Sequence, residues 1–167
     1  WEVDPAVSPD GTLVAFASNA GGSADIWLVE AGGGEPRQLT DVGVAPADAP
    51  DDLSPAWLPD GRSLLFSSDR SGTRSIWRVA FLGGSPRLVL ENADTPAVSP
   101  DGSLLAFSRA DRAGGYQRIW VAPLADPGRP TQLTKDSDGL WDHTHPVFSP
   151  DGRTVCYGDF RNLWLVD

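Results

Sequence analysis

Ser99-Pro100-Asp101-Gly102 leads directly into the apolar run Leu104-Leu105-Ala106-Phe107, and this combination decides the fold of the chain. The same four-residue pattern occurs three more times, with one Leu in place of Ser: Ser8-Pro9-Asp10-Gly11, Leu58-Pro59-Asp60-Gly61 and Ser149-Pro150-Asp151-Gly152. The glycines of the four copies are 50, 41 and 50 residues apart. The chain therefore consists of four copies of one structural unit.

Other residues keep a constant distance from each tetrapeptide. A proline stands six residues before each glycine, and an aromatic residue stands five residues after it. Repeats of about 40–45 residues are typical of propellers whose blades have four strands. The sequence therefore predicts an all-β propeller with four antiparallel blades, at residues 1–44, 45–92, 93–138 and 139–167.

The tetrapeptide predicts a tight turn between the first two strands of each blade, A and B. Proline at its second position presets φ for a type I turn, and glycine at its end tolerates a positive φ. Strand B is apolar on successive residues, so both of its faces should be covered by neighbouring blades. Strand C then carries a tryptophan, and strand D is expected at residues 36–40, 86–90 and 130–134.

The fourth copy ends with strand C at residues 163–167, so no strand D is expected there. Its apolar edge is of a kind that proteins normally cover. The chain also contains no methionine and begins with Trp1. We therefore expect either a fragment of a larger propeller or self-association of half-rings that completes the ring.

Two residue types in the repeat are interpreted as packing residues. Tryptophan recurs at one structural position, which favours contacts between blades over a ligand site; these residues are Trp27, Trp77, Trp120 and Trp164. Cys156, the only cysteine, takes the strand B position of Ala15, Leu65 and Ala106, and it is expected in the core.

The formal net charge of −10 argues against a nucleic-acid partner, whose phosphates require a basic surface. No apolar run reaches the length of a membrane span, so membrane insertion is not expected. The single cysteine excludes an intrachain disulfide and leaves the compartment undetermined.

These landmarks together resemble the TolB-type, WD-like propeller repeat. They include Pro-Ala-x-Ser-Pro-Asp-Gly at residues 96–102, Ser-Asp-Arg-x-Gly at 68–72, Ile-Trp-x-Val at 76–79 and Pro-Arg-x-Leu-Thr at 36–40. The resemblance implies a bacterial protein, and it favours the periplasm over the cytoplasm. The same repeat also builds the propellers of prolyl-oligopeptidase-family serine peptidases, so it implies the fold more than the function. The chain departs from its relatives, which have six or more blades.

The sequence contains no set of residues for catalysis. It has no Gly-x-Ser-x-Gly nucleophile elbow, no phosphate-binding loop, no Cys-x-x-Cys and no His-Glu-x-x-His. We therefore expect that the chain is not an enzyme and that it uses no cofactor and no metal.

Two segments interrupt the repeat, both between strand D of one blade and strand A of the next. They are residues 41–52 and 135–145, whereas the corresponding link at 91–95 is short. Insertions on one face of a repeat array often mark the binding face. The candidate binding residues are Asp48, Asp51, Asp52, Asp138, Trp141, Asp142, His143 and His145.

Two metal-site patterns within these links are weaker than their structural alternatives. His143 and His145 on an extended strand would point the same way, as metal ligands can, but a loop-to-strand junction is favoured. Residues 136–139 are similar to part of a calcium loop, but Thr134 stands where the first acidic ligand should be.

The leading hypothesis is a non-catalytic propeller that binds a protein or peptide with the face that bears the two long links. The alternative is part of the gating propeller of a prolyl-oligopeptidase-type serine peptidase, whose catalytic domain lies outside this sequence. A third hypothesis is a sensor segment of a bacterial regulator.

Overall fold

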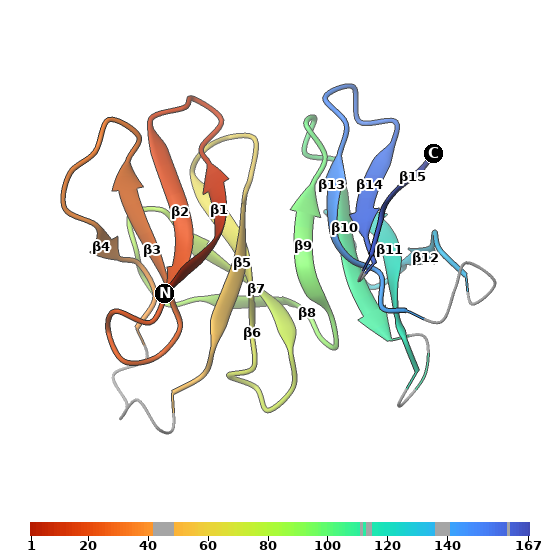
Figure 1. The fold of residues 1–167 in the computed structure, drawn as a ribbon, viewed down its shortest axis with the longest axis horizontal. Helices are drawn as coiled ribbons and strands as arrows, with labels where there is room; N and C mark the ends of the chain where they lie inside the picture. The colour runs from red at the N-terminus through yellow and green to blue at the C-terminus, as the bar shows by residue number, and fades with distance from the viewer. Residues whose placement is uncertain (42–48, 111, 113–114, 136–140, 160) are drawn as a thin grey trace.

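The computed structural model describes residues 1–41, 49–110, 112, 115–135, 141–159 and 161–167. These residues form four antiparallel sheets and no helix, which confirms the all-β prediction (Figure 1). No helix among them could therefore cross a lipid bilayer.

Each sheet is one blade, and its strands are hydrogen-bonded in chain order. The first blade contains β1 (Glu2–Val7), β2 (Leu13–Ser18), β3 (Asp25–Glu30) and β4 (Arg37–Gln38). The second contains β5 (Asp52–Trp57), β6 (Ser63–Ser68), β7 (Ser75–Ala80) and β8 (Arg87–Leu90). The third contains β9 (Asp94–Val98), β10 (Leu104–Ala110), β11 (Gln117–Pro123) and β12 (Thr131–Gln132). The fourth contains β13 (Thr144–Phe148), β14 (Val155–Gly158) and β15 (Leu163–Val166), and it lacks a fourth strand among the described residues.

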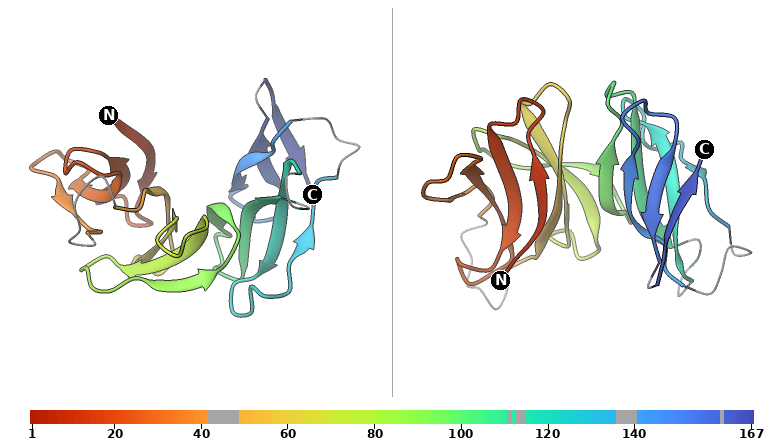
Figure 2. Two further views of the ribbon diagram at one scale, coloured as in Figure 1. Left: turned by 90° about the horizontal axis from the view of Figure 1, so that it is seen from below. Right: turned by 45° about the horizontal axis from the view of Figure 1, so that its top comes forward.

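The four blades follow an arc, with the first and fourth blades at its two ends (Figure 2). The first strands of successive blades lie side by side around the inside of the arc, in the order β1, β5, β9, β13. Among the described strands, those of the first and fourth blades do not pack together as successive blades do. The arc is therefore open on one side.

One packing rule joins successive blades. Small and aliphatic side chains of the first blade, such as Ala17 and Ile26, meet Trp57 and Phe66 of the second. In the same way, Leu65 and Ile76 of the second blade meet Phe107 and Trp120 of the third, and Ile119 of the third meets Tyr157 of the fourth. Each blade thus presents an aromatic face to the preceding blade and an aliphatic face to the following one.

This rule explains a departure from the predicted burial of strand B. Both faces of β6 are buried, whereas β2 and β14 are buried on one face and partly exposed on the other. Phe66 and Phe107 are 0% exposed, but the equivalent Phe16 lies on the open end of the arc and is only half-buried. Cys156, expected in the core, is also half-buried, because no other described blade packs against its face of the fourth blade. The prediction was wrong for the first and fourth blades, because each of them packs against one other blade among the described residues.

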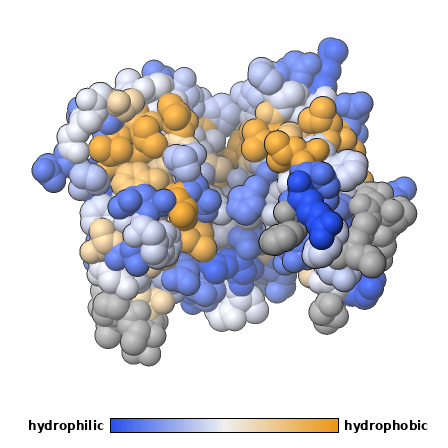
Figure 3. All heavy atoms as spheres, viewed as in Figure 1, coloured by the Kyte–Doolittle hydropathy of each residue, from blue (hydrophilic) through white to orange (hydrophobic). Residues whose placement is uncertain are grey.

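The open side of the arc carries two apolar areas, one over β1 and β2 and one over β13–β15 (Figure 3). Val7 is 61% exposed on the first blade. On the fourth blade, Val147 is 60% exposed and Leu165 is 74% exposed. We call these areas the first flank and the fourth flank.

The four predicted turns are present. In each, the amide of the glycine donates a hydrogen bond to the carbonyl oxygen of the first turn residue, with a distance of 2.9 Å. The glycine φ angles lie between 65° and 75°, at Gly11, Gly61, Gly102 and Gly152. The tight turn and the positive φ of its glycine, both inferred from Pro-Asp-Gly, are therefore confirmed.

An irregularity in strand A also repeats in every blade. The residue before the recurring proline has a positive φ, and the ladder shifts register there; these residues are Asp4, Ser54, Thr95 and His145. Such a bulge bends the strand and redirects the side chains on either side of it. In the fourth blade, this bulge determines the directions of the His143 and His145 side chains.

Candidate binding face

The up-and-down strand order places the B–C loops and the D–A links at one end of every blade. The A–B and C–D turns lie at the other end. The short link between β8 and β9 lies between the two long links, since blade two precedes blade three along the arc. Of the predicted site residues, Asp48 and Asp138 lie outside the described residues.

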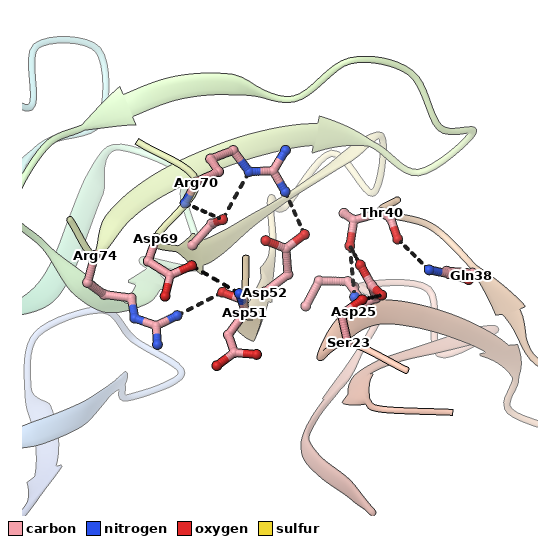
Figure 4. A network of polar contacts seen from close by, with 11 residues as sticks. Ser23, Asp25, Gln38, Thr40, Asp51, Asp52, Asp69, Arg70 and Arg74 are labelled. Atoms are coloured by element: carbon pink, nitrogen blue, oxygen red, sulfur yellow. Dashed lines mark hydrogen bonds and ion pairs between the residues drawn. The ribbon is translucent and has the colours of Figure 1, made fainter. Parts of the chain in front are cut away.

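Asp52 and Asp51 of the first link have different surroundings, although they are adjacent in sequence (Figure 4). The Asp52 side chain is 1% exposed, and its Oδ2 lies 2.6 Å from Nη2 of Arg70. Asp51 is exposed, and only its backbone is fixed. Its amide donates to Oδ1 of Asp69 at 3.0 Å, and its carbonyl oxygen accepts from Nη1 of Arg74 at 2.8 Å. Asp52 therefore holds the blade together, while the Asp51 carboxylate faces solvent.

Asp25, which the sequence did not single out, lies near the same junction (Figure 4). It is 3% exposed, and its Oδ2 accepts a hydrogen bond from Oγ of Ser23 at 2.8 Å. Burial raises the pKa of Asp25 above its usual value, and the negative charge of Asp52 raises it further. No sequence signal identified this residue, because the repeat places Ser75 and Arg118 at the equivalent positions.

The second link exposes Trp141 and Asp142. Trp141 is 45% exposed, and the guanidinium carbon of Arg161 lies 5.4 Å from the centre of its ring. Asp142 is exposed, and its Oδ1 accepts a hydrogen bond of 2.7 Å from the amide of Gln117. This link therefore offers an aromatic ring and a carboxylate at the surface.

His143 and His145 do not act as a pair. His143 is 1% exposed and packs against Tyr157, with ring centroids 4.8 Å apart. His145 is exposed, has a φ of 53°, and places its Nδ1 3.0 Å from Oγ1 of Thr144. The bulge of strand A separates the two side chains, which the assumption of a regular strand did not anticipate. In the described part of the chain, no three His, Cys, Asp or Glu side chains could hold a metal ion together.

A pocket of about 460 Å³ lies between the second and third blades, at the end that carries the links. The residues that define its chemistry are Arg74, Asn92, Asp94, Arg109, Arg112 and Gln117. Arg74 donates to the carbonyl oxygen of Asp51, and the amide of Gln117 donates to Asp142. Each long link is thus hydrogen-bonded to one wall of the pocket. Sequence reasoning missed the pocket, because its arginines stand in three different segments of two blades.

Arg109 lines the pocket and is held in place by the backbone. Its Nε and Nη2 donate to the carbonyl oxygens of Asn92 and Glu91, each at 2.9 Å. The guanidinium carbon lies 5.1 Å from the ring centre of Phe107. Burial lowers the pKa of Arg109 below its ordinary value.

A comparison with protein families matches residues 2–161 to the TolB beta propeller domain. The chain belongs to this family. The match extends over all four blades, and the TolB-type resemblance predicted from the repeat is confirmed.

Solved structures give the same fold. A TolB-like protein from Agrobacterium tumefaciens matches with a TM-score of 0.77 and 25% identity, over 94% of this chain and 53% of its own. TolB from Acinetobacter baumannii matches with a TM-score of 0.78 and 20% identity, over 99% of this chain and 40% of its own. A puromycin-hydrolyzing peptidase from Mycobacterium tuberculosis matches with a TM-score of 0.69 and 20% identity, over 95% of this chain and 25% of its own.

The chain thus spans about half of the length of the TolB structures or less, and a quarter of the peptidase. Among the curated proteins, a sequence comparison gives no match. The peptidase is an enzyme, but at 20% identity its likeness to this chain shows the fold alone.

Proposed function

We propose that this TolB-type propeller is a non-catalytic module that binds a peptide or a protein segment with the face that bears the D–A links. The observation that supports this most directly is the pocket between the second and third blades. Both long links are hydrogen-bonded to its walls, through Asp51 and Asp142. The links therefore flank a single concavity.

The exposed residues of the links suit a peptide partner. Trp141 offers a large ring that is 45% exposed, and tryptophan is enriched among the residues that dominate binding energy. Asp51, Asp142 and His145 are exposed polar residues that can form the rim of such an interface. Asp52 and His143 are buried and are not part of the proposed contact surface.

Selection from a phage library of random dodecapeptides tests the proposal. We expect enriched peptides to bind the wild-type chain and to lose most of their affinity for the double variant Asp51→Ala/Trp141→Ala. Leu82→Ala is the matched control, since Leu82 is 79% exposed in the C–D turn at the opposite end of the second blade. Peptides that bind the link variant as tightly as the wild type would refute the proposal, and so would the absence of any enriched peptide.

We also propose that a second copy of the chain covers the first and fourth flanks. By the packing rule, the aromatic face of Phe16 on the first flank should pack against an aliphatic face, and the fourth flank with Leu165 has such a face. The two flanks are therefore complementary. Such a contact is head-to-tail, and it forms a ring only if the rotation closes. Multi-angle light scattering at micromolar concentration should give twice the chain mass of 17.8 kDa. A cooperatively melting monomer would contradict self-association.

A further inference from the structure

We propose that the pocket between the second and third blades binds a side-chain carboxylate of the peptide. This inference rests on the proposed function and adds the chemistry of its central contact. Three arginines line the pocket, Arg74, Arg109 and Arg112, and the only acidic residue among the described lining residues is Asp94. A chain with a formal net charge of −10 thus concentrates positive charge at one concave place.

The positive charge of two of these arginines is not balanced by a carboxylate. In the part of the chain that the structure describes, the hydrogen bonds of Arg109 go to the backbone carbonyls of Asn92 and Glu91. The hydrogen bond of Arg74 goes to the carbonyl oxygen of Asp51. Arg70 is different, because its guanidinium forms an ion pair with Asp52. Carbonyl oxygens fix the direction of the Arg74 and Arg109 guanidinium groups without neutralising them.

The surroundings of Arg109 favour an incoming anion. Burial alone lowers its pKa, without an offsetting carboxylate. A bound carboxylate would compensate the desolvation of this guanidinium, and charge-assisted hydrogen bonds of this kind are stronger than neutral ones. Two of the side-chain nitrogens of Arg109 already hold it in place, so little side-chain entropy remains to be lost on binding.

A second hollow gives the bound peptide a direction. It has a volume of about 630 Å³, shares Asn92 and Arg109 with the pocket, and is lined by the strand β8 residues Leu88, Val89 and Leu90. Leu88 is 43% exposed. A carboxylate over Arg109 would therefore place a neighbouring apolar side chain against β8. The expected motif is an acidic residue next to an apolar one.

The acidic links on either side add selectivity to this site. Asp51 and Asp142 are exposed and are bonded to the pocket walls, so negative charge borders a positively charged centre. Uniformly acidic peptides would be repelled by this border. A single acidic residue within an otherwise neutral or basic segment fits the arrangement better.

The test uses dodecapeptides enriched by the phage selection, resynthesised with blocked ends and a fluorescein label. Each is paired with a copy in which every Asp or Glu is replaced by Asn or Gln. Fluorescence anisotropy is measured at about 0.15 M salt, where screening acts over about 8 Å, so that near charges dominate. We expect the enriched peptides to contain an acidic residue and the amide copies to bind on the order of tenfold more weakly or worse.

Arginine variants locate the effect. For Arg109→Gln and, separately, Arg74→Gln, we expect the affinity difference between the acidic peptide and its amide copy to shrink. Arg74 is the safer position, because it is not packed on a ring as Arg109 is on Phe107. Arg62→Gln removes the same charge from an exposed turn at the opposite end and should leave the difference intact.

Three results would overturn the inference while leaving the proposed function standing. The first is a set of enriched peptides without an acidic residue. The second is an amide copy that binds within twofold of its parent. The third is an affinity difference that Arg62→Gln reduces as much as Arg74→Gln does. A selection that yields no peptide would reject the proposed function, and this inference with it.

Discussion

Replacing Arg70 by Met should destabilise the chain more than most single substitutions on this face. Arg70 is 12% exposed and Asp52 is 1% exposed, and their charged atoms lie 2.6 Å apart. The Arg70 Nε also donates to Oγ of Ser68 at 2.9 Å, and its guanidinium carbon lies 5.2 Å from the ring centres of Phe66 and Trp77. Met keeps the apolar stem and leaves the Asp52 carboxylate buried without its partner.

The cost follows from that unpaired carboxylate. Breaking a buried ion pair by removing one partner costs about 3–5 kcal/mol. Oδ1 of Asp52 is already buried without a hydrogen bond in the described structure, so no second contact can compensate. With a urea m-value of about 2 kcal/mol/M, the unfolding midpoint should fall by about 2 M.

Equilibrium urea unfolding, followed by tryptophan fluorescence, measures this change. The double variant Arg70→Met/Asp52→Leu is the control, because it removes both charges. Replacing a whole buried pair by apolar residues is often close to neutral, so the double variant should regain most of the lost stability. A loss below about 1 kcal/mol for Arg70→Met, or a double variant that is less stable than Arg70→Met, would show that the pair does not hold β5 to the B–C loop.

Three further predictions concern the turns and the buried acid. Gly102→Val should cost about 1–3 kcal/mol, because a β-branched residue resists the φ of 75° there, and an unchanged urea midpoint would contradict this. Hydrogen bonds from Ser99 and Ser103 lower the pKa of Asp101 from 3.8 to about 2, so this carboxylate contributes stability above pH 4 that is lost as the pH falls toward 2. Ser99→Ala should raise the pKa of Asp101 in an NMR titration, and a pKa that stays near 2 would refute the assignment. Because the pKa of Asp25 is raised, its ionised form destabilises the fold above that pKa. Asp25→Asn should therefore be more stable than the wild type at pH 7, and this gain in stability should shrink as the pH is lowered. A gain that does not depend on pH would show that ionisation of the buried carboxyl is not its cause.

The blades could be predicted from the sequence because every repeat has the same turn residues and the same spacing of aromatic residues. Pro-Asp-Gly sets the turn geometry at each A–B connection, and its glycine has the expected positive φ in all four turns. The constant spacing of the tryptophans likewise predicted that Trp77 and Trp120 pack between blades, whereas the equivalent Trp164 of the fourth blade is 44% exposed. Such signals are local and repeat four times, so a single sequence reveals them.

The terminal blades and the site were predicted less well, because they depend on contacts between blades. Phe16 has the same place in its repeat as Phe66, yet it is half-buried because none of the four described blades packs against its face of the first blade. Asp51 and Asp52 are identical residues side by side, and only the position of Arg70 decides which of them is buried. The bulge before each proline, which separates His143 from His145, breaks the simple alternation of a strand.

The pocket also depends on contacts between blades, and the sequence did not predict it. Arg74 is the last residue of the B–C loop of the second blade, and Arg109 is the next-to-last residue of strand β10 in the third. Nothing in their spacing along the chain indicates that both line one concavity. Their proximity follows from the rotation between the two blades, which the repeat pattern does not encode locally.

Hydrogen–deuterium exchange with a selected peptide bound tests whether the end that carries the D–A links is the binding face. We expect slower exchange at the end that carries the D–A links, in residues 73–75, 91–94, 108–110, 112 and 115–117, which include the pocket lining. Exchange in the four A–B turns at the opposite end should stay unchanged, including the turn that contains Gly102. Protection confined to those turns, or to the first and fourth flanks, would contradict the assignment of the binding face.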